Sequence, residues 1–214
     1  GSANFTAQQI AEQLDFYGSY FDVNIDRDYT YISFCSLRKF FRPTVDVARE
    51  IILHPTFPEK ELRTYCTKRK QSLVIERQKV DMQSRELFSE ALFGKHHPYG
   101  TSASESLYDN ITREDIVELY KRLYTSENVF VVCSGRIDNE VLQAIEHIAM
   151  ELPVGEPSSV TFPEMISTPQ LRRDIDTALQ SSIRIGRLLF PRTHPDFVGM
   201  QVVATVLGGY FGLS

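Results

Sequence analysis

Apolar residues along this chain alternate with polar ones in some stretches and recur at helical spacing in others. Residues 20–26 alternate strictly, with every second side chain from Phe21 to Ile25 apolar, and this pattern predicts a half-buried strand. Residues 29–35 are rich in aromatic and β-branched side chains and predict a second strand. With Arg27-Asp28 as the turn, the two strands are expected to pair as an antiparallel hairpin.

Helices are predicted where apolar spacing coincides with capping signals. Thr6-Ala7-Gln8-Gln9 has the form of a capping box, in which Thr6 accepts from the Gln9 N–H and Gln9 reaches back. A helix is therefore expected from there to about Phe16, ending at Gly18. The same reasoning predicts further helices: residues 45–54, a long helix from Pro58 to Gln78, a helix capped by Ser84 and closed by Gly94, one capped by Thr112, one capped by Asp138, and one that starts at Pro195 and stops at Gly208-Gly209.

The long helix is the most strongly marked of these elements. His54-Pro55 ends the helix before it, because a residue that precedes proline is pushed out of the helical region. Pro58 starts the long helix, since proline at the first helical position gives up only an N–H that has no partner there. Leu62, Cys66 and Leu73 then recur at roughly helical spacing.

Two further apolar runs predict strands, on either side of a linker. Residues 129–133 are continuously apolar, which predicts a central strand covered on both faces, and residues 181–189 predict another strand. Between them, residues 152–169 have the proline, glycine and serine content of a linker and form the best candidate boundary. Helices that alternate with hairpin-paired strands predict an α+β fold, with helices packed on one side of a mainly antiparallel sheet.

Composition narrows the range of partners. The chain has 214 residues, of which 42% are hydrophobic, a formal net charge of −5 and a pI near 5.6. No excess of Lys and Arg is evident, so nucleic acid is not expected as the main partner. No window approaches the roughly 20 apolar residues of a membrane span, so no membrane contact is expected.

The first residues give no targeting signal. Gly1 to Phe5 contain no basic stretch followed by an apolar one, so no signal peptide is expected in them. Gly1-Ser2 has the form of a cloning remnant, with the natural chain starting upstream. The compartment is left open between cytoplasm and periplasm.

Cysteine and histidine residues form no recognisable metal motif. Cys35, Cys66 and Cys133 are far apart, each in an apolar pattern, and are expected to be buried free thiols. His96-His97 precedes the turn-rich Pro98-Tyr99-Gly100 and is interpreted as a loop element; metal ligation is the minor alternative. The sequence has no pair of histidines at i, i+4 flanking a glutamate, no Gly-x-Ser-x-Gly elbow and no P-loop.

The long helix carries a basic set of residues. Its members are Lys68, Arg69, Lys70, Arg77 and Lys79. Two interpretations stay open for the set: a solvated face, or a docking face for an acidic partner or a peptide carboxylate.

A series of segments stands in a characteristic order and spacing along nearly the whole chain. The segments are Phe5–Ala11, Leu14–Val23, Leu53–Phe57, Phe93–Gly100, Tyr124–Asn128, Gln180–Gly186, and His194–Phe197 continuing to Leu207–Phe211. Each segment alone is weakly specific, and the series is quite specific. Together they resemble the insulinase-like (pitrilysin) zinc metallopeptidase family, which includes the mitochondrial processing peptidase subunits.

This resemblance implies a fold, a domain division and partners. The fold would be α+β of the processing-peptidase (LuxS/MPP-like) type. Residues 1–160 would form most of one peptidase-like domain without its first strands, and residues 161–214 would form a linker and the start of the next. In the family, two such domains enclose a chamber that takes in extended peptides. A peptide substrate and a peptidase-family partner subunit are therefore the partners implied.

The resemblance also identifies where zinc ligands would lie. Active relatives carry an H-x-x-E-H helix just before the segment that matches Phe5–Ala11, and a glutamate of the long helix is the third ligand. That motif is not in these 214 residues. An ungapped alignment from Gly18 through Phe57 puts Gln71 at the third-ligand position, and its neutral amide cannot supply a carboxylate. Glu76 would serve only if the helix register shifts. Zinc is thus expected in active relatives and not in this chain, with no catalytic residue assigned.

Three interpretations follow. The leading one is a catalytically inactive family member that contributes to the substrate chamber or pairs with an active subunit. The alternative is part of an active zinc metallopeptidase whose H-x-x-E-H motif lies upstream of residue 1, with Glu76 as third ligand. The third is a plain interaction module with no peptidase partner, for which the sequence has no positive signal.

Self-association is a further expectation. Residues 161–214 would form an incomplete second domain with open strand edges, and open edges pair with other chains. We therefore predict a homodimer that forms through residues 170–214. Light scattering at high protein concentration should give a mass above that of the monomer, and a purely monomeric mass would contradict the prediction.

Overall fold

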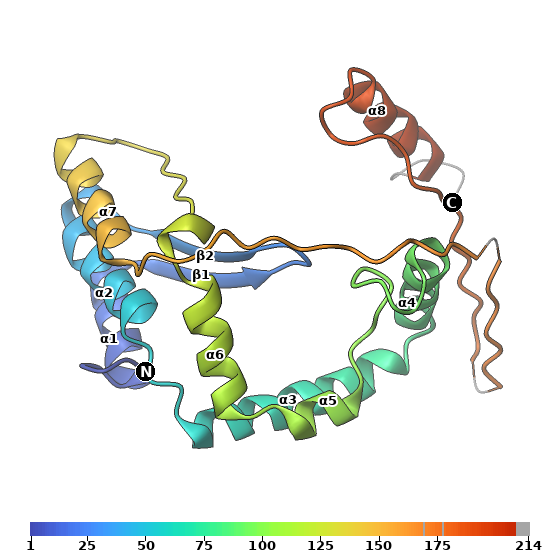
Figure 1. Cartoon of the computed structure of the whole chain (residues 1–214), viewed down its shortest axis with the longest axis horizontal. Coiled ribbons are helices and arrows are strands. Elements are labelled where there is room, and N and C mark those ends of the chain that lie inside the picture. The colour runs from blue at the N-terminus through green and yellow to red at the C-terminus, as the bar shows by residue number, and fades with distance from the viewer. Residues whose placement is uncertain (169, 177, 209–214) are drawn as a thin grey trace.

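The computed structural model of this chain describes all residues except 169, 177 and 209–214. Within the described residues, helices accompany a two-stranded antiparallel sheet, and α1 and α2 pack against it (Figure 1), which confirms the α+β class. The elements in chain order are α1 Ala7–Tyr17, β1 Tyr20–Ile25, β2 Thr30–Cys35, the 3-10 turn η1 Arg38–Phe40, α2 Phe41–Leu53, α3 Glu59–Arg77, α4 Val80–Phe93, α5 Glu105–Asn110, α6 Arg113–Leu123, the 3-10 turn η2 Ser126–Asn128, α7 Asn139–Glu151 and α8 Phe197–Gly208.

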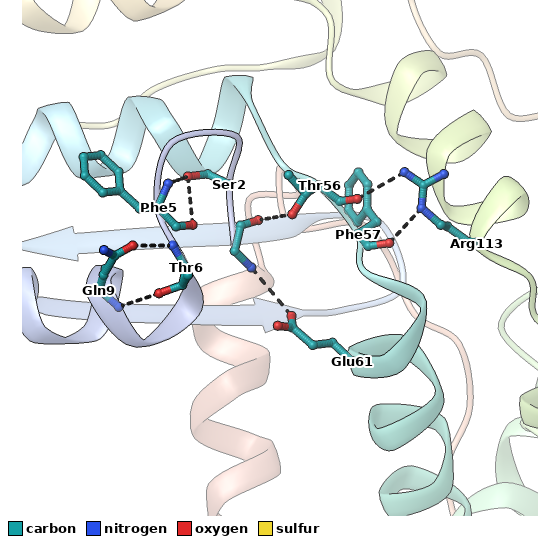
Figure 2. Close-up of polar contacts among 9 residues, drawn as sticks. Ser2, Phe5, Thr6, Gln9, Thr56, Phe57, Glu61 and Arg113 are labelled. Atoms are coloured by element: carbon teal, nitrogen blue, oxygen red, sulfur yellow. Dashed lines mark hydrogen bonds and ion pairs between the residues drawn. The ribbon is translucent and has the colours of Figure 1, made fainter.

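The capping signals of α1, α6 and α7 are confirmed. The Thr6 hydroxyl accepts from the Gln9 N–H at 3.2 Å, and the Gln9 side chain accepts from the Thr6 N–H at 2.9 Å (Figure 2). Gly18 ends α1 with a φ of 59°, in the left-handed conformation that glycine adopts without a steric penalty. Thr112 caps α6 and Asp138 caps α7 through their side chains.

The long helix is confirmed as α3, and the helix after it begins earlier than predicted. α4 starts at Val80, so Ser84 is an interior residue and its prediction as a cap is wrong. The Ser84 hydroxyl instead donates to the Asp81 carbonyl at 2.9 Å. Asp81 in the first turn favours the earlier start, because a carboxylate is stabilised beside the free N–H groups of a helix N-terminus.

The last predicted helix is present as α8, which begins two residues after Pro195. Its predicted stop at Gly208-Gly209 falls partly outside the described residues. None of the described helices combines the length and the apolar character that crossing a membrane requires.

β1 and β2 form the predicted hairpin, in a register that runs from Tyr20 opposite Cys35 to Ile25 opposite Thr30. The expectation of a half-buried strand is wrong towards the turn, where Ile25 is 68% exposed. Phe21 at the other end of β1 is half-buried. The cause is that α1 and α2 pack beside the base of the hairpin, while its tip extends past them (Figure 1).

The tip of the hairpin is tied to the loop after α4. Asp26 organises the predicted turn by accepting from the Asp28 N–H at 2.7 Å. The Tyr99 hydroxyl donates to the Asp28 carboxylate, and the Arg27 guanidinium donates to the Pro98 carbonyl at 2.9 Å. These contacts join segments that lie 71 positions apart in the sequence.

The two other predicted strands are wrong. Neither residues 129–133 nor residues 181–189 pair with a neighbour in the described part of the chain. Val132 is 82% exposed and Ile185 is 95% exposed. A strand exists only through hydrogen bonds to an adjacent strand. An apolar pattern can express a preference for burial, but it cannot supply that neighbour.

The expected burial of the cysteines is correct for one of the three. Cys66 is buried, whereas Cys35 and Cys133 are exposed, and all are free thiols. Cys133 lies in the run that forms no sheet. Cys35 ends β2 on the face of the hairpin whose residues are all exposed. Both cysteines have apolar neighbours in the sequence, but their side chains are exposed in the folded chain.

The core lies where α1, α2 and α7 meet. The helices α1 and α7 both pack on α2, and α3 leaves this body and carries α4 at its far end (Figure 1). The buried apolar residues of the three core helices are Leu14, Val47, Ala48, Val141 and Ala144.

An ion pair ties η1, just before α2, to the N-terminus of α7. The Arg38 guanidinium lies 2.6 Å from the Asp138 carboxylate, which also accepts from the Val141 N–H at 3.1 Å. The hydrogen bond from Arg38, followed by that from Val141, holds the pKa of Asp138 below its ordinary value of 3.8.

This arrangement predicts part of the acid dependence of stability. Because the carboxylate is favoured in the fold, its contribution to the free energy of unfolding is present above pH 3.8 and is lost as the pH falls through the lower folded-state pKa. Asp138→Asn keeps a capping oxygen but cannot titrate. Its stability should therefore fall less steeply on acidification than that of the wild type.

Urea unfolding at pH values on either side of 3.8 measures this difference. Asp22→Asn is the matched control, because Asp22 is an exposed aspartate of β1. Equal acid dependence of the wild type and Asp138→Asn would contradict the prediction.

Candidate functional site

The predicted ligand position lies on α3. Gln71 is exposed and Glu76 is half-buried, and α3 is one helix from Glu59 to Arg77. Five residues of α-helix correspond to a rise of about 7.5 Å and a rotation of about 140°. The two side chains therefore leave different turns of α3 in different directions, so they cannot both occupy one ligand position.

No metal-binding cluster accompanies either residue. In the part of the chain that the structure describes, no three His, Cys, Asp or Glu side chains gather as a metal ion would require. A catalytic zinc ion takes three protein ligands and keeps a fourth position open. The donors present in the described residues therefore do not fit a catalytic zinc ion.

His96-His97 lies in the loop after α4, as predicted. His97 is 5% exposed, and its Nδ1 atom accepts from the Tyr99 N–H at 3.1 Å. Its ring stacks between those of Phe93 and Phe162, with centroid distances of 5.3 Å to each. A histidine that is buried between aromatic rings, with one ring nitrogen already bonded, serves to hold the loop together.

Part of the basic set on α3 is neutralised within the chain. Lys70 lies 2.7 Å from the Asp109 carboxylate of α5, and the hydrogen bond to that carboxylate raises the pKa of Lys70. Arg77 lies 3.0 Å from Glu86 of α4. The other basic residues of the set are exposed, and their use as a docking face stays a prediction.

A polar cavity of about 520 Å³ lies where α3 meets α4. Charges of both signs face it, with Arg77 beside Glu86 and with Lys95 3.5 Å from Glu90. Because these acids and bases pair with each other, the cavity has no strong excess of either charge. Its lining residues are Arg77, Gln83, Glu86, Glu90, Lys95, Gly100, Thr101, Ser102 and Arg173.

An apolar groove of about 590 Å³ lies between α1 and the N-terminal half of α3. Its polar rim includes Glu61, whose carboxylate is 3.6 Å from the amino group of Gly1 (Figure 2). A concave apolar surface with few polar groups is the usual form of a site for apolar groups. The lining residues are Gly1, Ala7, Ile10, Ala11, Leu14, Phe21, Ile51, Pro55, Phe57, Pro58, Glu61, Leu62, Tyr65 and Ile116.

One wall of the groove is the joint between α2 and α3. Phe57 has a φ of 45°, and Arg113 of α6 donates to the Phe57 carbonyl at 2.9 Å and to the Thr56 carbonyl at 3.2 Å (Figure 2). The Tyr120 ring packs on that of Phe57, and its hydroxyl donates to the Ile52 carbonyl at 2.6 Å. Sequence reasoning missed Arg113 and Tyr120, because their partners lie 56 to 68 positions away.

Two sequence profiles of one peptidase family match the chain in succession. The profile described as insulinase (peptidase family M16) matches residues 1–104, and that described as the peptidase M16 inactive domain matches residues 110–213. The chain belongs to the insulinase-like M16 peptidase family.

Relatives and solved structures agree with this M16 assignment. The uncharacterized zinc protease YmxG of Bacillus subtilis (strain 168) is 24% identical over 216 residues, which cover 98% of this chain and 51% of YmxG. The peptidase M16 inactive domain from Pseudomonas fluorescens has a TM-score of 0.77 at 20% identity, over 98% of this chain and 52% of that one. A protease from Helicobacter pylori has a TM-score of 0.66 at 15% identity, over 79% and 42% of the two chains.

This M16 chain spans about half the length of these relatives. The likeness to the solved structures, at 20% identity and below, shows the fold alone. The Bacillus relative is named a zinc protease. The His, Cys, Asp and Glu side chains in the described part of this chain form no cluster that fits a catalytic zinc ion.

A glutamate at position 71 should not create a zinc site. Gln71→Glu supplies one carboxylate where no cluster of ligands exists in the described residues, and a catalytic zinc ion needs three protein ligands. Metal analysis after incubation with zinc and dialysis should give substoichiometric zinc in both the wild type and the variant.

Gln78→Glu is the matched control, because Gln78 is another exposed glutamine at the end of the same helix. Stoichiometric zinc in Gln71→Glu but not in Gln78→Glu would overturn the prediction and would mean that the other ligands lie beside Gln71.

Proposed function

We propose that this chain is a non-catalytic M16 family member that forms part of the wall of a peptide-enclosing chamber and acts beside an active peptidase subunit. The observation that carries the proposal is Gln71. It occupies, by resemblance, the position of the third zinc ligand, and an amide lacks the negative charge that a carboxylate contributes there. The Gln71 side chain is exposed on an uninterrupted α3, and this supports the same interpretation.

A role in holding peptide is supported by the hairpin and the apolar groove. Neither edge of the β1–β2 hairpin has a further strand among the described residues, and residues 30–35 carry no charge. An extended peptide can add to such an edge as a further strand through main-chain hydrogen bonds. Phe21 of β1 also lines the apolar groove, so apolar side chains of the same peptide have a place to bind.

The active-peptidase alternative receives no support from the geometry of α3. It requires Glu76 as third ligand, and Glu76 lies more than one turn from Gln71 in a continuous helix. Its H-x-x-E-H motif would lie upstream of residue 1, outside these 214 residues. No specific observation favours the plain interaction module.

The first test concerns the purified chain. We expect no stoichiometric zinc and no cleavage of a quenched fluorescent extended peptide, with or without added zinc. The chain should nevertheless increase cleavage by a family partner that carries H-x-x-E-H and is identified by co-purification from a native extract. Zinc-dependent cleavage by the chain alone, or failure of an identified partner to gain activity, would overturn the proposal.

A charged variant of β2 tests peptide binding separately from association with the partner subunit. Tyr31→Lys places a charge on β2, at a side chain that is 42% exposed, and edge charges block strand pairing. With the partner present, it should raise KM several-fold and leave kcat nearly unchanged, because it removes uniform binding. Met150→Lys, at an 80% exposed residue of α7 that does not line the groove, is the control for added charge.

A further inference from the structure

The proline-rich segment after α7 is held in place although it forms no helix or strand. Residues 153–168 have no regular secondary structure. In Figure 1 this segment, in orange, runs extended from α7 to the region of α4. Ten extended residues, such as 159–168, reach about 33–36 Å. Contacts at both ends of the segment fix its course.

We call the two sites that hold this segment the first and second stations. The first station is the turn η2, which binds the backbone of residues 153–158. The Ser126 N–H donates to the Pro153 carbonyl at 3.0 Å. The Asn128 side chain donates to the Glu156 carbonyl at 3.2 Å and accepts from the Ser158 N–H at 2.6 Å. One amide side chain therefore supplies both hydrogen bonds that a neighbouring strand would give.

Two further residues complete this station. The Glu127 carboxylate accepts from the Gly155 N–H at 2.8 Å, and this backbone hydrogen bond lowers the pKa of Glu127. The Thr125 hydroxyl, in a residue 3% exposed, accepts from the Asn128 side chain at 2.9 Å and orients it. A Cβ atom at position 155 would lie 2.5 Å from the Thr125 methyl group, so only glycine allows this approach.

The second station is the loop after α4. The Phe162 ring stacks on His97 at a centroid distance of 5.3 Å and packs against Tyr99 at 5.6 Å. The Thr168 N–H donates to the Ala91 carbonyl at 2.8 Å, near the end of α4. The buried His97 noted above is thus the anchor for an aromatic side chain that arrives from 65 positions along the chain.

Beyond the second station, Ser182 and Arg184 also contact α4. The Ser182 hydroxyl is 2.8 Å from that of Ser84, and the Arg184 guanidinium donates to the Ser84 hydroxyl at 3.0 Å and binds Asp81. Ser84, wrongly predicted as a helix cap, is a contact point for these later residues. The contacts at the two stations bring the chain close to this part of α4.

We propose that residues 153–168 are a strap, clamped by η2 at one end and by the His97 loop at the other, that brings the chain to α4, where Ser182 and Arg184 bind. The first station recognises main-chain atoms and the small size of Gly155. The second recognises the aromatic ring of Phe162. Apart from these two positions, the strap tolerates changes of side chain.

Hydrogen exchange tests the strap in the intact protein. The amides of Gly155, Ser158 and Thr168 should exchange at least about tenfold more slowly than in an unstructured peptide. Asn128→Leu, which keeps the approximate shape of the side chain and removes both of its hydrogen bonds to the segment, should return Ser158 to the peptide rate. Phe162→Ala should do the same for Thr168.

Controls lie on the strap itself. Val160 is 63% exposed and lies between the stations, so Val160→Ala should leave all three amides protected. Glu156→Ala should do so as well, because η2 binds the backbone of residue 156. Limited proteolysis should cut residues 153–168 several-fold faster in Asn128→Leu and Phe162→Ala than in these controls.

Two outcomes overturn the proposal. Peptide-like exchange of the three amides in the wild type would show a free linker. Protection that survives both Asn128→Leu and Phe162→Ala would show that other contacts hold the segment. If Asn128→Leu fails to fold, as judged by exchange in α2 and α7, Gly155→Ala tests the first station through its clash with Thr125 and must expose Ser158.

Discussion

The direction in which α3 leaves the core depends on one backbone joint at residues 54–58. Phe57 has a positive φ there, a conformation that costs of order 1–3 kcal/mol in a non-glycine residue and persists only where its surroundings hold it. Arg113 binds its carbonyl, and Tyr120 packs against its ring. The helix α6 thus braces the joint, and through α3 it sets the positions of α4, the apolar groove and the polar cavity.

The helix α3 also limits the chemistry that the described residues can support. Because α3 is continuous, the direction of each side chain follows from its position, and Glu76 points away from the direction of Gln71. The carboxylates nearby pair with Lys70 and Arg77 and not with each other. The charged side chains along α3 and α4 therefore connect these helices and α5 through ion pairs.

Extended segments divide into two kinds according to how their backbone groups are satisfied. β1 and β2 pair with each other, while the apolar runs at 129–133 and 181–189 have no strand neighbour in the described residues. The strap is different, because side chains of Glu127 and Asn128 replace a neighbouring strand. These side chains bind the backbone of the strap, and its own residue types matter at Gly155, where the backbone comes close, and at Phe162, whose ring stacks on His97.

Local signals in the sequence determined the elements whose causes are local. The capping boxes at Thr6 and Thr112 and the glycine at 18 act within a few residues, so these helix ends could be read directly, as could the hairpin turn at Arg27-Asp28. The ordered series of family segments likewise determined the family and the α+β fold. The prediction of Ser84 as a cap failed because α4 has a favourable first turn that contains Asp81, three residues earlier.

Features with distant causes were decided only by the tertiary structure. Val132 and Cys133 have a buried-strand pattern and are exposed, because burial requires a neighbour that a pattern cannot provide. The roles of Arg113, Asn128 and His97 depend on partners 28 to 65 positions away. Hydrogen bonds and ring stacking act over a few ångströms, so their existence is fixed by how the chain folds back on itself, which local sequence does not encode.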